Sequence, residues 1–206
     1  MEDRVFEKKE LIVSDMRRAN VPEKFWYVTL SCIPKDLPYM NKVLSYYAKM
    51  DEMVEKGIGL YLYSKDNQTG KTSISVALLK RALRLRKTAF FDEAGRLKNA
   101  LIKNAEFDET FMVDQRIQTV DLLVIDDLGK EYRTGSGYAE NTFENIIRSR
   151  IQSLRPTIIT SNLSPKDVGN VYSKSLSAML KGSLIPIDIS GYNWSIKQEA
   201  ELKKLL

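Results

Sequence analysis

The sequence predicts an α/β fold in which a parallel five-stranded sheet is flanked by helices. Two patterns favour this class. Short apolar runs alternate along the chain with longer segments of helical periodicity. One run, residues 122–125 (LLVI), is apolar at every position, which is typical of a central strand buried on both faces. The alternation predicts βαβ units with helices on both faces of the sheet.

The elements follow in chain order. The expected strands are the short apolar runs at residues 58–63, 88–91, 122–125, 157–160 and 184–189. The expected helices, in which apolar residues recur at helical spacing, are residues 39–55, 71–86, 93–104, 108–118, 139–153, 165–181 and 195–206. In domain terms we expect a short N-terminal arm or helix (1–20), a core (21–195) and a C-terminal helix (196–206), without a separate lid domain.

Composition limits the class of protein. With 206 residues, 43% of them hydrophobic, the chain is long enough for one well-packed domain. It has no run of eighteen apolar residues and no signal-peptide core at its start, so we expect a cytoplasmic protein without a membrane partner. Cys32 is the single cysteine, which fits a reducing compartment. The absence of histidine excludes imidazole metal sites and Ser-His or Cys-His catalysis, and the net charge of +5 mildly favours nucleic acid.

Residues 64–72 (SKDNQTGKT) end like a phosphate-binding loop and lie between an expected strand and an expected helix. Such loops follow G-x-x-x-x-G-K-S/T. Gly70, preceded by Thr69, lets the backbone approach a phosphate without a Cβ in the way. Lys71 would reach the β- and γ-phosphates, and Thr72 would ligate Mg²⁺. We therefore expect residues 69–72 to bind a nucleoside triphosphate.

The loop departs from that pattern at two positions. Lys65 occupies the position of the first glycine, and Gln68 that of another glycine found in a frequent variant. If the loop needs a positive φ at either position, each substitution costs roughly 1–2 kcal/mol. The charge of Lys65 near the phosphates would offset part of this cost.

Two carboxylates follow the strand at residues 122–125. Asp126 is expected at the carboxyl edge of the sheet, where it would hold Mg²⁺ directly or through water. Asp127 is placed to orient or deprotonate an attacking water. After the next strand, Asn162 would bond the γ-phosphate or its water. The alternative interpretation is a strand that ends in two capping acids, which is rare at this interval after Gly-Lys-Thr.

Longer blocks resemble the DnaC/IstB family of AAA+ ATPases, namely residues 121–129 (DLLVIDDLG), 133–135 (RTG) and 155–162 (RPTIITSN). Residues 19–25, 57–63 and 90–101 are similar to other parts of that family, so the similarity covers roughly residues 19–195. The resemblance implies a P-loop NTPase core of AAA+ type. The nucleotide residues of the family correspond to Lys71, Thr72, Asp126, Asp127 and Asn162.

The resemblance also implies ATP and Mg²⁺ as cofactors, self-association into a ring or spiral, and binding to single-stranded DNA. The best-known members load a replicative, DnaB-like helicase, and we expect that function here. Residues 22–27 are the expected neighbour of the adenine. Two rivals stay open: an IstB-like transposition helper that acts with a transposase on duplex DNA, and a nucleotide-degenerate adaptor that binds a helicase or DNA without turning over ATP.

Two departures from the family bear on this function. Relatives supply an arginine finger to the neighbouring subunit's ATP from the helix before the last strand, but this chain has no arginine after Arg155. Lys174 or Lys181 would replace it, or no residue does. A lysine lacks the planar fork of arginine, and a finger is worth about 10³–10⁵ in rate, so we expect weak hydrolysis. Bacterial loaders of this family also carry a helicase-binding domain before the core. In this chain only about twenty residues precede the part that resembles the family.

The expected DNA contacts are basic side chains. Arg96, Lys98 and Lys103 are the candidates for single-strand binding, because in this family the corresponding helix lies near the pore of the ring. Residues 80–87 form a second basic stretch, whose other interpretation is a solvated helix face.

Overall fold

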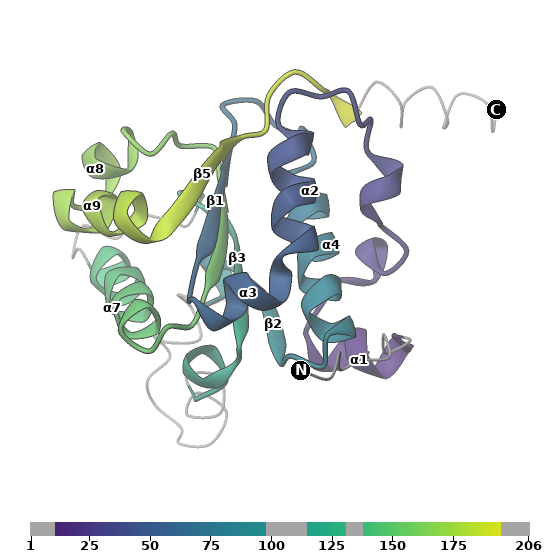
Figure 1. Ribbon diagram of the computed structural model, residues 1–206. Helices are drawn as coiled ribbons and strands as arrows, with labels where there is room; N and C mark the ends of the chain where they lie inside the picture. Colours follow the sequence, from purple (N-terminus) through teal and green to yellow (C-terminus); the bar gives the residue numbers. More distant parts are fainter. Residues whose placement is uncertain (1–10, 98–114, 131–137, 195–206) are drawn as a thin grey trace.

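The computed structural model describes residues 11–97, 115–130 and 138–194 (Figure 1). Its strands are β1 (Gly59–Tyr63), β2 (Ala89–Glu93), β3 (Leu122–Leu128), β4 (Thr157–Ser161) and β5 (Leu184–Asp188). Its α-helices are α1 (Val13–Arg18), α2 (Met40–Ala48), α3 (Met50–Glu55), α4 (Lys71–Arg84), α7 (Tyr138–Gln152), α8 (Val168–Val171) and α9 (Lys174–Ser183). Two 3₁₀ turns are η1 (Glu23–Phe25) and η2 (Leu30–Cys32). Within these described stretches, no helix has both the length and the apolar character that crossing a membrane requires.

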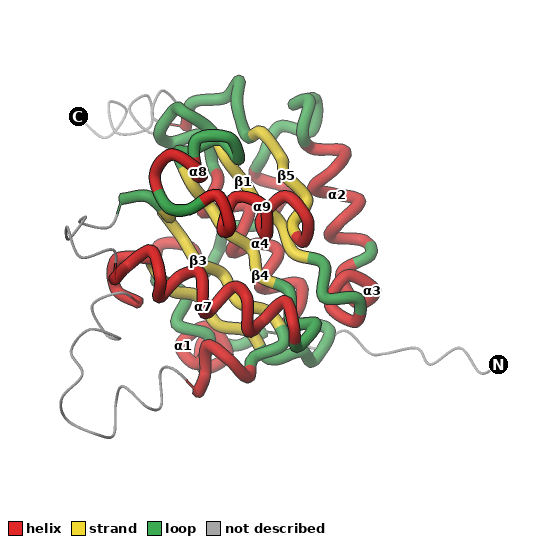
Figure 2. The backbone as a smooth tube through the Cα atoms, turned by 90° about the vertical axis from the view of Figure 1, so that its left-hand side faces the viewer, coloured by secondary structure: helices red, strands yellow, loops and turns green. Residues whose placement is uncertain are grey.

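The strands form one five-stranded parallel sheet in the order β2-β3-β4-β1-β5. Figures 1 and 2 show α2 and α4 on one face of the sheet and α7, α8 and α9 on the other. Because the strands are parallel, their carboxyl ends share one edge, and β1, β3 and β4 are neighbours in its centre. The predicted fold class, a parallel five-stranded sheet flanked by helices, is confirmed.

Each face of the sheet packs on its own hydrophobic cluster, because successive strand side chains point to opposite faces. Leu60 and Leu62 of β1 are buried in one cluster with Leu78 of α4. Tyr61, between them, is buried in the other cluster with Leu180 of α9. Burial on both faces explains why the central strands are apolar at nearly every position.

The outer edge of β2 is covered by residues that follow α1. The backbone N–H of Phe91 donates to the carbonyl oxygen of Ala19 at 2.9 Å, and the side-chain amide of Asn20 donates to the carbonyl oxygen of Phe91 at 2.9 Å. Met16 and Ala19 are buried in the same cluster as Leu60. Residues 11–20 therefore complete the core of the sheet's edge, and the domain boundary at residue 20 stays a prediction.

Two expected helices are divided. The segment expected over 39–55 forms α2 and α3, which meet at Lys49 (φ −94°, ψ 17°). The sequence has neither glycine nor proline at that point, so periodicity alone predicted one helix. Within the segment 165–181, α8 ends at Val171 and α9 begins at Lys174. The expected terminal helix and most of residues 93–118 lie outside the described residues.

Candidate nucleotide site

The phosphate loop connects the carboxyl end of β1 to the first residue of α4. Gly70 is the N-cap of α4 and has a φ of +95°, a conformation that glycine adopts without a steric penalty. Thr69 before it is buried. The N-terminus of a helix carries a partial positive charge and N–H groups without helical partners, both of which favour an anion. Strand, loop and helix thus have the order that the sequence predicted for a phosphate site.

Backbone strain in the loop falls on one of the two positions that lack glycine. Gln68 has a φ of +57°, in the left-handed region, which costs a non-glycine residue about 1 kcal/mol. Lys65 is not among the described residues with positive φ, and its side chain is exposed. The expected cost therefore applies to Gln68 and not to Lys65.

The ammonium group of Lys71 is buried within the loop. Its Nζ donates to the carbonyl oxygen of Asp66 at 2.9 Å and lies 3.5 Å from the carbonyl oxygen of Ser64 and 3.4 Å from Thr69 Oγ1. Burial lowers the pKa of Lys71, partly opposed by nearby carboxylates. Neutral acceptors are weaker partners for an ammonium than a phosphate oxygen is. The loop therefore holds Lys71 in a position from which it can exchange carbonyl partners for a phosphate.

Thr72 and Asp126 meet at the carboxyl edge of the sheet although they are 54 residues apart. The hydroxyl of Thr72 lies 3.0 Å from each carboxylate oxygen of Asp126. Thr160 of β4 donates to Asp126 Oδ1 at 2.6 Å and accepts from the backbone N–H of Asp127 at 2.9 Å. Carboxylates and hydroxyls are hard oxygen ligands, which suit Mg²⁺ held jointly with nucleotide phosphates. The donor set of Thr72 and Asp126 therefore fits the predicted magnesium site.

The carboxyl group of Asp126 is unusually easy to protonate. Burial raises its pKa to about 6, the hydrogen bonds from Thr160 and Thr72 oppose that rise, and the charge of Asp127 adds to it. Only 4% of Asp126 is exposed. A bound cation would favour the charged form, because its positive charge offsets the loss of hydration.

The two acids lie within a β-bulge of β3. In the register with β4, Ile125 pairs with Ile159 and Leu128 pairs with Ser161, so β3 has one more residue than β4 between these pairs. A bulge bends its strand and re-aims the side chains there. The sequence predicted that the strand ends at Ile125; β3 instead continues to Leu128, because the bulge lets both acids stay within it.

The predicted catalytic residues lie at the same edge. Asp127 has a φ of +60°, and its carboxylate lies 3.0 Å from Lys130 Nζ. The amide nitrogen of Asn162 donates to the side-chain oxygen of Asn67 at 2.9 Å, which connects the end of β4 to the phosphate loop. The structure thus brings Asp127 and Asn162 to the edge of the loop, while their roles toward a nucleotide stay predictions.

Family comparison agrees with this arrangement. The family described as IstB-like ATP binding protein matches residues 52–192, a span that contains the phosphate loop, β3 and β4. The chain belongs to this family. Membership in the IstB-like family makes nucleotide binding the expected property of the site. Among curated proteins, comparison found no significant match.

The fold of this IstB-like chain is similar to that of several proteins of known structure. DnaI has 19% identity and a TM-score of 0.72, covering 82% of this chain and 94% of that chain. The DnaC helicase loader has 20% identity and a TM-score of 0.70, covering 82% of this chain and 100% of that chain. The replication initiator DnaA, bound to AMPPCP and single-stranded DNA, has 18% identity and a TM-score of 0.64, covering 81% of this chain and 50% of that chain. At these identities the likeness concerns the fold alone.

Sequence reasoning missed Thr160. It chose Asn162 from the polar end of the strand, whereas Thr160, two residues earlier, contacts the buried carboxylate. A threonine near the carboxyl end of a strand that follows the strand carrying the acids was the available signal. Thr160 is fully buried, so its hydroxyl needs partners within the protein.

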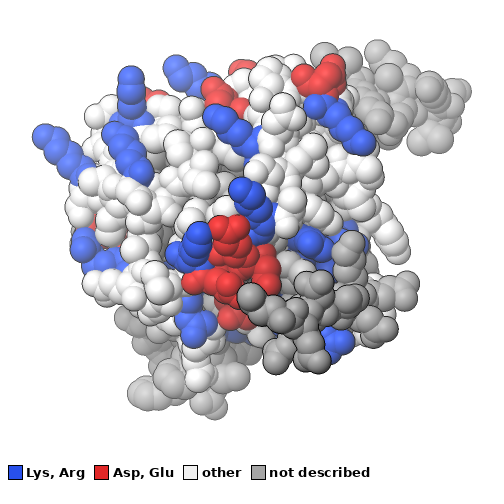
Figure 3. Space-filling model, viewed as in Figure 1, with Lys and Arg blue, Asp and Glu red and all other residues white. Residues whose placement is uncertain are grey.

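The basic stretch at residues 80–87 is only partly solvated. Lys80 is buried, and its Nζ donates to the carbonyl oxygens of Trp26 and Val28, which ties that segment to α4. Lys87 Nζ lies 2.8 Å from Asp51. On the face seen in Figure 3, acidic side chains gather over α3 and basic ones are scattered around them. These contacts give at least two of the basic residues a structural role.

The single-strand candidates are described only in part. The guanidinium of Arg96 is largely exposed and lies 3.6 Å from Asp92. Lys98 and Lys103 lie outside the described residues, as do residues 133–135. DNA binding by this group stays a prediction.

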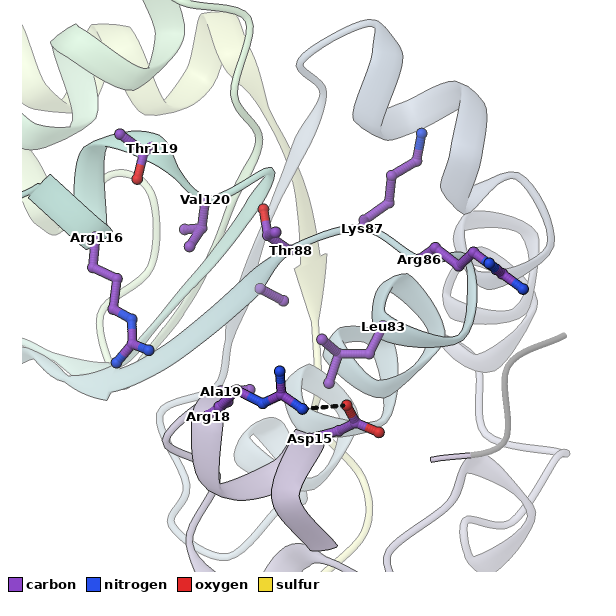
Figure 4. A pocket seen from close by; sticks show the side chains of 11 residues that line it. Asp15, Arg18, Ala19, Leu83, Arg86, Lys87, Thr88, Arg116, Thr119 and Val120 are labelled. Carbon is purple, nitrogen blue, oxygen red and sulfur yellow. Dashed lines mark ion pairs between the residues drawn. The ribbon is translucent and has the colours of Figure 1, made fainter. Parts of the chain in front are cut away.

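A cavity of about 690 Å³ lies at the opposite edge of the sheet, beside the starts of β2 and β3 (Figure 4). The guanidinium of Arg18 lies 3.7 Å from Asp15 in its wall. Figure 4 shows Arg86 and Lys87 pointing away from Arg18. Because these cations do not converge on one point, the cavity lacks the focused charge of the phosphate loop. It is separate from the nucleotide site.

Proposed function

We propose that the chain binds ATP with Mg²⁺ at the carboxyl edge of β1, β3 and β4. The observation that carries this proposal is the contact between the Thr72 hydroxyl and both oxygens of Asp126, beside the buried Lys71. A lysine, a hydroxyl and a carboxylate in this arrangement are the groups that P-loop NTPases use on phosphates and magnesium. The IstB-like family match supports ATP as the nucleotide.

The ATP-bound protein would load a replicative, DnaB-like helicase onto single-stranded DNA during DNA replication. The fold shared with DnaI and with the DnaC helicase loader supports this role. The DnaA structure with single-stranded DNA supports a DNA strand as ligand. In this proposal the chain acts as a ring or spiral of copies in the cytoplasm.

Hydrolysis in this proposal is weak, and ATP serves mainly as a switch for assembly. Gln68 strains the loop, and α9 supplies no arginine to a neighbouring copy. Lys174 and Lys181, near the two ends of α9, are exposed and offer only point charges.

Co-purification with the replicative helicase of the host, with and without ATP, tests the loader role. We expect capture that depends on ATP in the wild-type chain and is lost in Lys71→Ala. Capture that is equal in both proteins, and indifferent to ATP, would instead support the nucleotide-degenerate adaptor.

A transposition helper is the second candidate, and the IstB-like family match is the observation that favours it. Competition between single-stranded and duplex DNA separates the two. A loader prefers the single strand, whereas a helper that acts with a transposase prefers the duplex.

A further inference from the structure

The chain returns to the phosphate loop after β5. The backbone N–H of Ile189 donates to the carbonyl oxygen of Tyr63 at 2.7 Å, and that of Trp194 donates to the carbonyl oxygen of Gln68 at 2.9 Å. The first bond lies at the end of β1 and the second within the loop. Residues 189–194, which we call the return segment, therefore run beside the loop and are bonded to it.

The indole of Trp194 lies against Gly70. A Cβ built on Gly70 would lie 2.7 Å from the indole Nε1 and 3.3 Å from its Cδ1. A side chain at position 70 would therefore collide with the indole in addition to adopting a φ of +95°. Because Gly70 is the N-cap of α4, the indole flanks the helix N-terminus at which phosphates would bind.

Tyr192 extends this aromatic surface. Its ring lies edge-on to the indole of Trp194, with centroids 5.1 Å apart and an interplanar angle of 75°. Trp194 also packs against the hydrophobic cluster on the α4 side, and its side chain is only half-buried. The core therefore fixes one part of the indole, and its Nε1 edge is buried against Gly70, while the side chain as a whole is partly exposed.

This placement suits the part of a nucleotide that the phosphate loop does not hold. A nucleoside triphosphate bound by its phosphates at the start of α4 extends its sugar and base beyond the loop. An aromatic ring in contact with a base contributes about 1–3 kcal/mol to binding. We propose, on the basis of the proposed ATP binding, that Trp194 contacts the sugar and base of the bound nucleotide, so that affinity depends on the nucleoside as well as on the phosphates.

Intrinsic fluorescence tests this contact directly, since Trp26 and Trp194 are the two tryptophans of the chain. Trp26 belongs to the segment expected beside the adenine, so calorimetry first establishes that Trp26→Phe still binds AMPPNP. In that variant Trp194 is the only tryptophan that contributes to the emission. Titration with magnesium and AMPPNP should change its emission saturably, with a midpoint equal to the calorimetric Kd of the same variant. Emission that stays constant while calorimetry records binding overturns the inference and leaves the proposed function intact.

A second readout separates contact with the nucleoside from a structural role. In Trp194→Ala, affinity for AMPPNP should fall about 5- to 100-fold, whereas affinity for inorganic tripolyphosphate should stay unchanged. Trp194→Phe, which retains an aromatic ring, should recover most of the loss. Equal losses for both ligands would mean that Trp194 only supports the loop, and unchanged affinities would also overturn the inference. Absence of any Lys71-dependent binding in the wild-type protein would overturn the proposed function itself.

Discussion

Thr160 of β4 donates a hydrogen bond to Asp126 of β3 across an oxygen-to-oxygen distance of 2.6 Å. The same hydroxyl accepts the backbone N–H of Asp127. It therefore orients the carboxylate toward Thr72, which approaches from α4. This fully buried hydroxyl makes the site a unit of three elements and leads to the first prediction.

Thr160→Val should weaken both the site and the fold. Valine has the shape of threonine without the hydroxyl, so the variant leaves a buried carboxylate and a buried N–H without this partner, at a cost of about 1–3 kcal/mol in the free energy of unfolding. Affinity for magnesium and AMPPNP should fall about tenfold or more, as for other residues that orient a metal ligand. Thr160→Ser is the matched control, because it retains the hydroxyl. Urea unfolding measures the stability of the two variants, and calorimetry measures their affinity for magnesium and AMPPNP. The prediction fails if Thr160→Val and Thr160→Ser have equal stability and equal affinity.

Asp126→Asn should stabilise the metal-free protein while it abolishes magnesium-dependent nucleotide binding. The pKa of Asp126 is raised to about 6 mainly by burial, so above that pH the folded chain carries a charge that folding disfavours. Asparagine removes the charge, which should raise the free energy of unfolding by about 1–3 kcal/mol at pH 8.

The stabilisation by asparagine should depend on pH, because Asp126 loses its charge when it is protonated. As the pH falls through 6 toward 4, Asp126 in the folded protein becomes neutral and the advantage of asparagine should disappear. Asp127→Asn is the control, since Asp127 is partly exposed and should change stability little. Unfolding curves at pH 8 and pH 4.5 without magnesium measure the difference, and an advantage of equal size at both pH values would contradict the account.

Magnesium-dependent affinity for nucleotide should decrease below about pH 6. Protons compete with the metal for Asp126, whose pKa is raised to about 6 by burial. The fall should approach tenfold per pH unit. Titrations in EDTA provide the control, because they isolate the protonation of the nucleotide itself. If the contribution of magnesium to the nucleotide affinity stayed constant from pH 8 to pH 5, this would show that Asp126 does not bind the ion.

Replacing Gln68 with glycine should stabilise the protein, because Gln68 has a φ of +57°. Relief of the strain is worth about 1–2 kcal/mol and the backbone entropy of glycine costs about 0.5–1 kcal/mol, so the expected net gain is roughly 0.5–1 kcal/mol. Lys65→Gly is the matched control in the same loop. Since Lys65 lacks a positive φ, glycine there should bring no gain and should cost about 0.5–1 kcal/mol in backbone entropy. Thermal unfolding measures the stability of both variants. Equal shifts of their Tm values would contradict the assignment of strain to Gln68.

The sequence predicted the sheet and the phosphate loop because both depend on local patterns. Apolar runs such as residues 122–125 indicate burial on both faces, and Gly70 with Lys71 marks the start of a helix whose N-terminus favours an anion. The division between α2 and α3 was not predictable in this way, because no residue at Lys49 signals it.

Contacts between segments that are far apart in the sequence were also not predicted. Arg150 is fully buried, and its guanidinium donates to Thr157 Oγ1 and to the carbonyl oxygens of Ile117, Val120 and Pro156. Its partners come from two other parts of the chain, so helical periodicity could not distinguish it from a solvated residue. Trp194 and Gln68 are in contact for the same kind of reason, since the return segment meets the loop only in the folded chain.

Calorimetric titration of magnesium and ATP into the wild-type protein and Lys71→Ala tests the central claim most directly. We expect wild-type binding that requires magnesium, and a loss of at least tenfold in affinity in Lys71→Ala, since the ammonium can no longer meet the phosphates. Absence of binding in the wild-type chain, or equal affinity in both proteins, would contradict the assignment of the nucleotide site.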